Sequence, residues 1–320
     1  MGVGGRLLVV GVWLLVIAWS VIGCQLSVIG CHISLVAYPL PPAPPQCQPR
    51  YRLILVILQS PKSIPMPDIL EEIIADKRAE LTAITQKSRS MKRHLAESKS
   101  GIIAEFKRKS PSKGWIHADA KAEEVVPQYA EGGASAVSIL TNEKYFGGST
   151  AFIQAVRALV PDLPILRKEF IIDEYQVYEA KIIGADAILL IAASLTPDHY
   201  SSLLCTAHSL GLEVLLEVHA PEELAYLDAG IPDMLGVNNR SLGTFHTDVQ
   251  HSFDIAEQMQ AAVAHLPEAE RPLLVSESGI SNPDIVRQLR RSGFRGFLIG
   301  ECFMKEEKPG KALRQFISKL

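Results

Sequence analysis

The sequence lacks the features that would place it in several common functional classes. Its five cysteines include no CxxC pair, so neither a structural zinc site nor a thioredoxin-like redox motif is indicated. Lys and Arg number 32 against 35 Asp and Glu, so the basic excess of nucleic-acid-binding proteins is missing and no nucleic-acid partner is expected. With 48% hydrophobic residues and a formal net charge of −3, the composition is typical of a globular enzyme.

The first 65 residues differ from the rest of the chain. Leu7–Ala37 is strongly apolar and longer than the roughly 20 apolar residues that cross a bilayer. Within it, residues 20–24 (SVIGC) recur unchanged as residues 27–31, a tandem copy with no evident packing logic. Residues 39–49 then form a proline-rich segment that is typical of extended, poorly packed chain.

Three interpretations of this extension stay open. Translation can start at Met66, the apolar run can be a signal peptide or membrane anchor, or residues 1–65 can be a structured part of the fold. We expect an extension outside the fold, which leaves residues 66–320 as one catalytic domain. A membrane partner is expected only if the extension is translated and retained.

Residues 66–320 carry the pattern of an α/β protein. Met66–Ser98 has apolar residues at helical spacing and predicts a helix. After it, short continuous apolar runs, typical of strands buried on both faces, alternate with amphipathic helical stretches. The expected strands are Ile102–Phe106, Ala136–Leu140, Pro164–Lys168, Ala187–Leu190, Glu213–Glu217, Met234–Asn238, Leu273–Ser276 and Gly296–Ile299. The expected helices are Ala122–Glu131, Ala151–Val160, Glu174–Ile183, Pro197–Ser209, Pro221–Ala229, Ser252–His265, Pro283–Arg291 and Pro309–Lys319.

This alternation predicts a single (β/α)8 TIM barrel with an extra N-terminal helix. Eight strand–helix units in a chain of this length match that architecture. A doubly wound open sheet is the rival, and it usually carries a glycine-rich dinucleotide loop after the first strand. Here the first strand is followed by Lys107-Arg-Lys-Ser110-Pro-Ser, so the barrel is favoured.

The active site is expected where the strands end, because barrel enzymes place it at the carboxyl ends of their strands. Lysines and carboxylates that point into one mouth shift each other's pKa values and supply general acids and bases. The turns after the seventh and eighth strands suit a phosphate, since backbone N–H groups there can bind an anion. The residues at these strand ends are Glu105, Lys107, Lys168, Glu217, Asn238, Asn239, Arg240, Glu277, Ser278, Gly279, Gly300 and Glu301.

Eight sequence blocks, in order over Ile69–Leu320, resemble the indole-3-glycerol phosphate synthase family. They are IIADKR (73–78), IIAEFKRKSPSKG (102–114), SILTNEKYFGGS (138–149), LRKEFIIDEYQVYEAKIIGADAILLI (166–191), LLEVH (215–219), GVNNRSLGTF (236–245), VSESGI (275–280) and FLIGECFM (297–304). The family has no counterpart to residues 1–65, which is the main departure. Its extra N-terminal helix matches the helix predicted before the first strand.

The resemblance implies a carboxy-lyase of tryptophan biosynthesis. The family closes a pyrrole ring on 1-(2-carboxyphenylamino)-1-deoxyribulose 5-phosphate, with loss of carbon dioxide and then water. Lys168 is implied as the general acid that protonates the substrate ketone. Glu217, Glu105 and Lys107 are implied in the other proton transfers, without a fixed division of roles among them.

The resemblance also implies binding roles. Asn238 and Arg240 are the implied substrate-orienting pair, and the planar guanidinium of arginine suits a carboxylate. Phe146 is implied in an apolar wall under the anthranilate ring, and Ser110 in a further substrate contact. The implied phosphate contacts are Ser278, Gly279, Gly300 and Glu301.

Cofactors and partners follow from the same resemblance. No metal, flavin or nicotinamide is expected, because no motif calls for one and the chemistry needs none. His219 is expected to be structural, since the family's proton transfers use lysines and glutamates. The expected partner is a phosphorylated small molecule, and the protein is expected to be a cytoplasmic monomer. An association with other tryptophan-pathway enzymes stays open.

Two other functions fit the sequence less well. A barrel resembling phosphoribosylanthranilate isomerase would need a catalytic cysteine near the end of the first strand, where Glu105 and Lys107 stand instead. A membrane-tethered, non-catalytic barrel would not need the acid–base set at the mouth. Both are therefore less favoured than the synthase.

Overall fold

The computed structural model describes residues 73–78, 89–241, 243 and 246–320. The fold below is that of the compact unit Ile74–Leu320. The predicted extension 1–65 and its boundary at Met66 lie outside the described residues. Within the described ranges, no helix is both long enough and apolar enough to cross a membrane.

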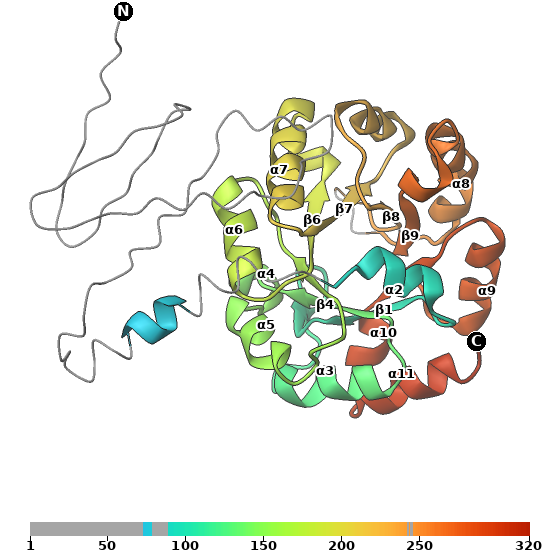
Figure 1. Cartoon of the computed structure of the whole chain (residues 1–320). Helices are drawn as coiled ribbons and strands as arrows, with labels where there is room; N and C mark the ends of the chain where they lie inside the picture. Colours follow the sequence, from blue (N-terminus) through green and yellow to red (C-terminus); the bar gives the residue numbers. More distant parts are fainter. Residues whose placement is uncertain (1–72, 79–88, 242, 244–245) are drawn as a thin grey trace, which may run out of the picture. The chain divides into compact units, whose positions relative to one another are not determined.

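Eight parallel strands close into a barrel, as the sequence predicted (Figure 1). Around the barrel the strands follow the order β1-β10-β9-β8-β7-β6-β5-β4, and β4 pairs with β1 to close it. The strands are β1 (Ile102–Phe106), β4 (Ala136–Leu140), β5 (Ile165–Lys168), β6 (Ala187–Ile191), β7 (Glu213–Val218), β8 (Met234–Asn238), β9 (Leu273–Glu277) and β10 (Gly296–Ile299).

Helices surround the strands. The longer ones are α3 (Ala122–Glu131), α5 (Thr150–Arg157), α6 (Glu174–Ile182), α7 (Pro197–Ser209), α8 (Gln250–Val263), α9 (Pro283–Arg291) and α11 (Pro309–Ile317). Short elements that the sequence did not predict are α4 (Glu143–Phe146), α10 (Glu301–Met304), η1 (Ala192–Ser194) and η3 (Glu268–Glu270).

One predicted amphipathic helix has a different form. Pro221–Ala229 folds as the 3-10 helix η2 and not as an α-helix. A 3-10 helix rises about 2.0 Å per residue against about 1.5 Å for an α-helix. The segment between β7 and β8 therefore spans a greater length of the barrel than an α-helix with the same number of residues would.

The predicted helix Met66–Ser98 is not continuous. Residues 73–78 are helical, and α2 (Met91–Glu97) is a separate helix, because Arg89 and Ser90 between them are not helical. The Ser90 side chain accepts a hydrogen bond from the Arg93 backbone N–H at 3.1 Å and so caps α2. A serine cap fixes an extended backbone at its own position, which ends any helix arriving from the N-terminal side.

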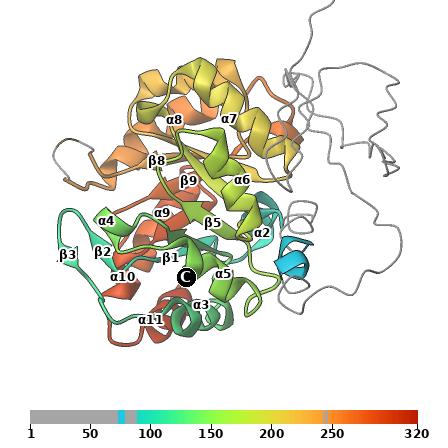
Figure 2. The ribbon, with the colours of Figure 1, turned by 90° about the vertical axis from the view of Figure 1, so that its left-hand side faces the viewer.

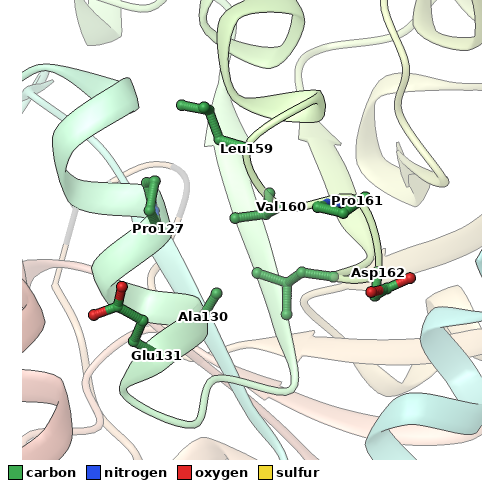
Figure 3. Close-up of a pocket in the computed structure, with 8 residues that line it drawn as sticks. Pro127, Ala130, Glu131, Leu159, Val160, Pro161 and Asp162 are labelled. Atoms are coloured by element: carbon green, nitrogen blue, oxygen red, sulfur yellow. The ribbon is translucent and has the colours of Figure 1, made fainter.

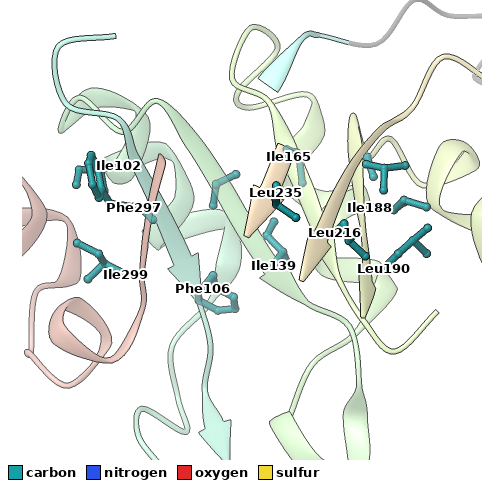
Figure 4. Close-up of a cluster of buried hydrophobic side chains, with 14 of the residues drawn as sticks. Ile102, Phe106, Ile139, Ile165, Ile188, Leu190, Leu216, Leu235, Phe297 and Ile299 are labelled. Carbon is teal, nitrogen blue, oxygen red and sulfur yellow. The ribbon is translucent and has the colours of Figure 1, made fainter. Parts of the chain in front are cut away.

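Strand alternation divides the core into two layers. One side of each strand packs against the helices, as Ile102, Ile139 and Leu216 do in Figure 4. The other side fills the barrel interior with residues such as Ile103 and Leu215. Two residues of α2, Met91 and Leu95, belong to this interior cluster, so α2 closes one end of the barrel.

The opposite end carries a two-stranded hairpin, β2 (Lys109–Ser110) and β3 (Gly114–Trp115), which the sequence did not predict. Figure 2 shows α2 and the hairpin at the two ends of the barrel. Arg108 anchors the hairpin through hydrogen bonds to the carbonyl of Gly147 at 2.8 and 3.0 Å and lies over the Trp115 ring. Arg108 is therefore structural, while Lys107 before it pairs with Glu105 on the inner face.

Shortening a side chain of α2 that fills the end of the barrel should lower the stability of the whole barrel. Leu95 is 1% exposed within the interior cluster, so Leu95→Ala leaves a cavity and should lower the free energy of unfolding by about 2–5 kcal/mol. Leu159→Ala is the control, because Leu159 is 52% exposed and its loss should change stability by less than about 0.5 kcal/mol. Urea denaturation measures both, and equal losses would show that α2 does not support the core.

Candidate active site

The polar residues of the barrel interior gather at the carboxyl ends of the strands. Glu105 follows Ile103 on the inner face of β1, Lys168 follows Leu166 on β5, and Glu217 follows Leu215 on β7. Strand alternation gives each of these polar residues the same orientation as the apolar residue two positions earlier. The same spacing places Asn238 and Glu277 on the inner face, where they pair in register across β8 and β9.

Lys168 lies at the centre of this group. Its Nζ is 2.8 Å from Glu217 Oε2 and 2.5 Å from Glu277 Oε2. Burial lowers the pKa of Lys168, but the charges of Glu217, Glu277 and Glu105 outweigh it and hold the pKa above its usual value. Lys168 is therefore protonated at neutral pH and can act as an acid. It makes no pair with Glu169, whose carboxylate accepts hydrogen bonds from Thr141 and Asn142 on the outer side.

The two carboxylates that contact Lys168 have opposite pKa shifts. Burial raises the pKa of Glu217, yet the positive charge of Lys168 prevails, with smaller contributions from His219 and a hydrogen bond from Asn238, and the pKa is lowered. For Glu277, burial and the negative charge of Glu217 prevail over Lys168 and raise the pKa to about 8. Two carboxylates with separated pKa values beside one ammonium can supply an acid and a base together.

Glu277 is the site residue to which sequence reasoning gave no role. Its position two residues after Val275 on β9 was the available signal, because Val275 is an interior core residue. The Glu277 carboxylate packs against Gly236 of β8, where an added Cβ would lie 2.4 Å from Glu277 Oε1. The absence of a side chain at position 236 therefore gives this carboxylate its space.

Glu105 and Lys107 form a second charged pair on the inner face. Lys107 Nζ lies 2.6 Å from Glu105 Oε1. Glu105 in turn leans on Gly300, where an added Cβ would lie 2.6 Å from its Oε1. The charge of Glu105 also reaches Lys168, whose pKa it helps to raise, so the two charged groups belong to one site.

Arg240 connects the strand ends to the hairpin. Its guanidinium donates to Ser112 Oγ at 3.3 Å and lies 4.0 Å from Glu301 Oε2, and its backbone N–H donates to Asn238 Oδ1 at 3.0 Å. Lys113 at the hairpin tip is 2.5 Å from Glu301 Oε1, a contact that sequence reasoning missed because no strand end positions Lys113. Burial raises the pKa of Glu301, but Lys113 prevails and the pKa is lowered.

The turn after β9 has an unusual backbone. Ser278 has φ 68°, the only positive φ of a non-glycine residue in the described ranges, and Gly279 follows with φ 78°. Ser278 accepts a hydrogen bond through its carbonyl from Asn239 Nδ2 at 3.0 Å, and Asn239 Oδ1 accepts from Ser252 at 2.8 Å. This buried network holds a conformation that side-chain-bearing residues rarely adopt.

Two further predicted residues lie beside the mouth. Phe146 of α4 stacks at an angle on Phe170, with ring centroids 6.3 Å apart, and Phe170 is 44% exposed. Ser110 is buried in β2 and accepts a hydrogen bond from the Lys113 backbone N–H at 3.3 Å. The structure therefore places Phe146 in an aromatic pair at the mouth and Ser110 inside the hairpin.

Unpartnered polar atoms concentrate at the same end. Six buried side-chain atoms in the described ranges have no hydrogen-bond partner, and five of them belong to the barrel mouth or to the interior just beneath it. Such atoms are costly in a protein interior unless a ligand meets them. The five are Ser138 Oγ, Arg240 Nε, Glu277 Oε1 and both ring nitrogens of His219, and the sixth is Arg157 Nε.

A hollow at the other end of the barrel does not resemble this site. It has about 240 Å³ and lies between the C-terminal part of α3 and the chain that enters β5 (Figure 3). The charged residues that line it are two acids, Glu131 and Asp162. The constellation at the strand ends is therefore the candidate active site.

Comparisons of sequence agree with this geometry. The sequence model of the family described as indole-3-glycerol phosphate synthase matches residues 68–316. The chain belongs to the indole-3-glycerol phosphate synthase family. A relative of that name from Bacteroides thetaiotaomicron is 56% identical over 267 residues, which cover 79% of this chain and 98% of the relative. Another, from Carboxydothermus hydrogenoformans, is 42% identical over 71% of this chain and 82% of its own length.

Solved structures support the fold of this chain. A 3-hexulose-6-phosphate synthase superposes with a TM-score of 0.52 at 13% identity, covering 68% of this chain and 99% of its own. A chain of the tryptophan synthase complex from Pyrococcus furiosus gives 0.51 at 14% identity, covering 70% and 99%. At these identities the likeness shows the barrel alone.

The raised pKa of Glu277 predicts a protonated carboxyl group in neutral solution. Infrared difference spectroscopy should show a carboxyl band that disappears with a midpoint near pH 8 and is missing in Glu277→Gln. Glu217→Gln should lower the midpoint, because it removes the negative charge that helps to raise it. Glu169→Gln, on the outer face beside Lys168, should leave it unchanged. An unshifted midpoint in Glu217→Gln would show that the charge of Glu217 does not raise the pKa of Glu277.

Proposed function

We propose that this chain converts 1-(2-carboxyphenylamino)-1-deoxyribulose 5-phosphate to indole-3-glycerol phosphate, with Lys168 as the general acid. The observation that carries the proposal is the position of Lys168 between Glu217 and Glu277 inside the barrel mouth. Membership of the synthase family supports the substrate and the product.

Ring closure requires a proton for the ketone oxygen as the aromatic carbon attacks. Lys168 supplies it, because its pKa is held high and the ammonium is fixed at the end of β5. A buried cation also stabilises the negative charge that develops on that oxygen, in a mouth where little water screens it. Glu217 holds the ammonium in place, and Asn238 holds Glu217 through a hydrogen bond.

The later proton transfers use the remaining acids and bases. Decarboxylation returns the electron pair of the broken bond to the six-membered ring and restores its aromaticity. Loss of the hydroxyl as water then needs a proton donor to that oxygen. Lys107, paired with Glu105 on the inner face, is the proposed donor, with Glu105 as its partner. Glu277 accepts the last ring proton in its ionised form, which a carboxyl group with a pKa of about 8 still populates as a minor fraction at neutral pH.

Substrate binding uses the rim. Arg240 faces the substrate carboxylate, Phe146 with Phe170 forms the apolar wall for the aromatic ring, and Ser110 adds a contact from the hairpin. The phosphate is proposed to bind at Ser278-Gly279 and Gly300-Glu301 through backbone N–H groups. Glu301 does not repel it, because Lys113 and Arg240 neutralise that carboxylate.

The physiological setting is part of the proposal. A phosphorylated small molecule is the partner, and no second chain is needed to complete the sheet, because the barrel closes on itself. We therefore propose a cytoplasmic monomer, with any association with other tryptophan-pathway enzymes made through its outer surface.

The test is fluorescence-monitored formation of indole-3-glycerol phosphate by the full chain. The expected result is turnover of the carboxyphenylamino substrate, with no isomerisation of phosphoribosylanthranilate. A folded preparation that does not turn over the first substrate, or that isomerises the second instead, refutes the proposed function.

Lys168→Ala should remove the general acid. The rate constant kcat is expected to fall by roughly 10²–10⁴-fold while substrate still binds, because the binding groups lie on other strands. Single-turnover fluorescence and calorimetric titration measure the two effects, with Glu169→Ala as the control on the outer face. Near-normal turnover in Lys168→Ala would move the general-acid role to Lys107.

Gly236→Ala should displace Glu277 without removing any reacting group. Its new methyl group would lie 2.4 Å from Glu277 Oε1 and 3.0 Å from Leu215 Cδ1, so kcat should fall roughly 10- to 100-fold while KM changes little. Gly236→Ala/Leu215→Ala removes only the apolar clash and should stay slow. Recovery of kcat in that double variant would show that the clash with Leu215, and not the displacement of Glu277, slows Gly236→Ala.

A further inference from the structure

We propose that His219 and Glu223 form a proton relay that connects solvent to Lys168 through Glu217. This proposal rests on the proposed function, since it concerns how the same site regains its protons. His219 would act through Glu217 without touching the substrate, which makes it a positioning and relay residue.

The overall reaction requires such a supply. The substrate carboxylate carries one negative charge and leaves as neutral carbon dioxide, and the ketone oxygen leaves as water. Counting hydrogens, substrate plus one proton gives indole-3-glycerol phosphate, carbon dioxide and water. Each turnover therefore takes one proton from solvent into a site whose acids are buried.

The four groups stand in a row. Lys168 Nζ is 2.8 Å from Glu217 Oε2, and Glu217 Oε1 is 3.4 Å from His219 Nε2. His219 Nδ1 is 4.0 Å from Glu223 Oε2. The two ring nitrogens thus face two carboxylates in opposite directions, which is the arrangement that lets an imidazole accept a proton on one side and release it on the other.

Exposure increases outward from Glu217 to Glu223, while Lys168 on the other side of Glu217 faces the mouth and is 14% exposed. The side chain of Glu217 is 3% exposed, that of His219 12% and that of Glu223 20%. Glu223 belongs to η2, which covers the outside of β7, so it can exchange protons with water. The row therefore leads from the buried acid to the rim.

The His219 ring is held at its backbone but not at its nitrogens. Its backbone N–H donates to Glu223 Oε2 at 2.5 Å, and its carbonyl accepts from His251 Nε2 of α8 at 2.9 Å. Both ring nitrogens are buried without a hydrogen-bond partner in the described ranges. A purely structural histidine normally satisfies at least one ring nitrogen, whereas this ring can rotate slightly toward either carboxylate.

The path that returns a proton to Lys168 has four transfers. After Lys168 has given its proton to the ketone oxygen, the Glu217 carboxylate takes a proton from His219 Nε2 and passes it to the neutral amine of Lys168. His219 then regains a proton on Nδ1 from Glu223, and Glu223 regains one from water. Each transfer moves one proton inward, and the proton of His219 then returns from Nδ1 to Nε2 before the next turnover.

The experiment measures kcat of the full chain against buffer concentration at fixed pH and ionic strength. His219→Ala should lower kcat about tenfold or more in dilute buffer with KM little changed. Added imidazole should restore the rate in a saturable way, because a small base can replace the missing ring, while the wild type stays insensitive. His219→Gln fills the space without a basic nitrogen, and it should show the same loss if the alanine variant fails to fold.

Two neighbours provide matched controls. Glu223→Gln keeps an acceptor for the His219 backbone N–H but cannot carry a proton, so it should also slow turnover and gain from added buffer. His251→Gln alters only the contact to the His219 carbonyl, so imidazole should not accelerate it. Wild-type kcat in both His219 variants, or a loss that neither imidazole nor buffer restores, would overturn the relay. No turnover by the wild type would instead overturn the proposed function.

Discussion

The ammonium of Lys168 between the carboxylates of Glu217 and Glu277 is the interaction on which this site depends. Three ionisable groups share the low-dielectric interior of a barrel, where an unpaired charge would be very costly. Their mutual contacts make the arrangement possible, and they also separate the pKa values of the two acids. The same contacts therefore provide both the stability of the cluster and its capacity for proton transfer.

The barrel places stability and chemistry at opposite ends. At one end, Met91 and Leu95 of α2 complete an apolar interior. At the other end, the inner face of β1, β5, β7 and β9 changes from apolar to charged within two residues, as from Leu166 to Lys168 on β5. Strand alternation makes that change abrupt, so a largely apolar interior supports a charged mouth.

Small residues matter as much as charged ones in this mouth. Glu277 occupies space left by Gly236, and Glu105 occupies space left by Gly300. Each carboxylate lies flat against a neighbouring strand and so remains within reach of its lysine. Contacts at the rim also shape the mouth. Lys113 and Arg240 pair with Glu301 and so hold the hairpin beside the turn proposed for phosphate.

The sequence by itself determined the barrel, the strand positions and the inward orientation of Glu105, Lys107, Lys168 and Glu217, because continuous apolar runs and a period of two are local properties. Only the tertiary structure decided which of these residues touch. Glu277 meets Lys168 across 109 positions of sequence, and Lys113 meets Glu301 across 188. Local patterns carry no information on contacts between residues so far apart in the chain. Barrel closure brings the strand ends together, and that closure turns a row of separate charges into one site.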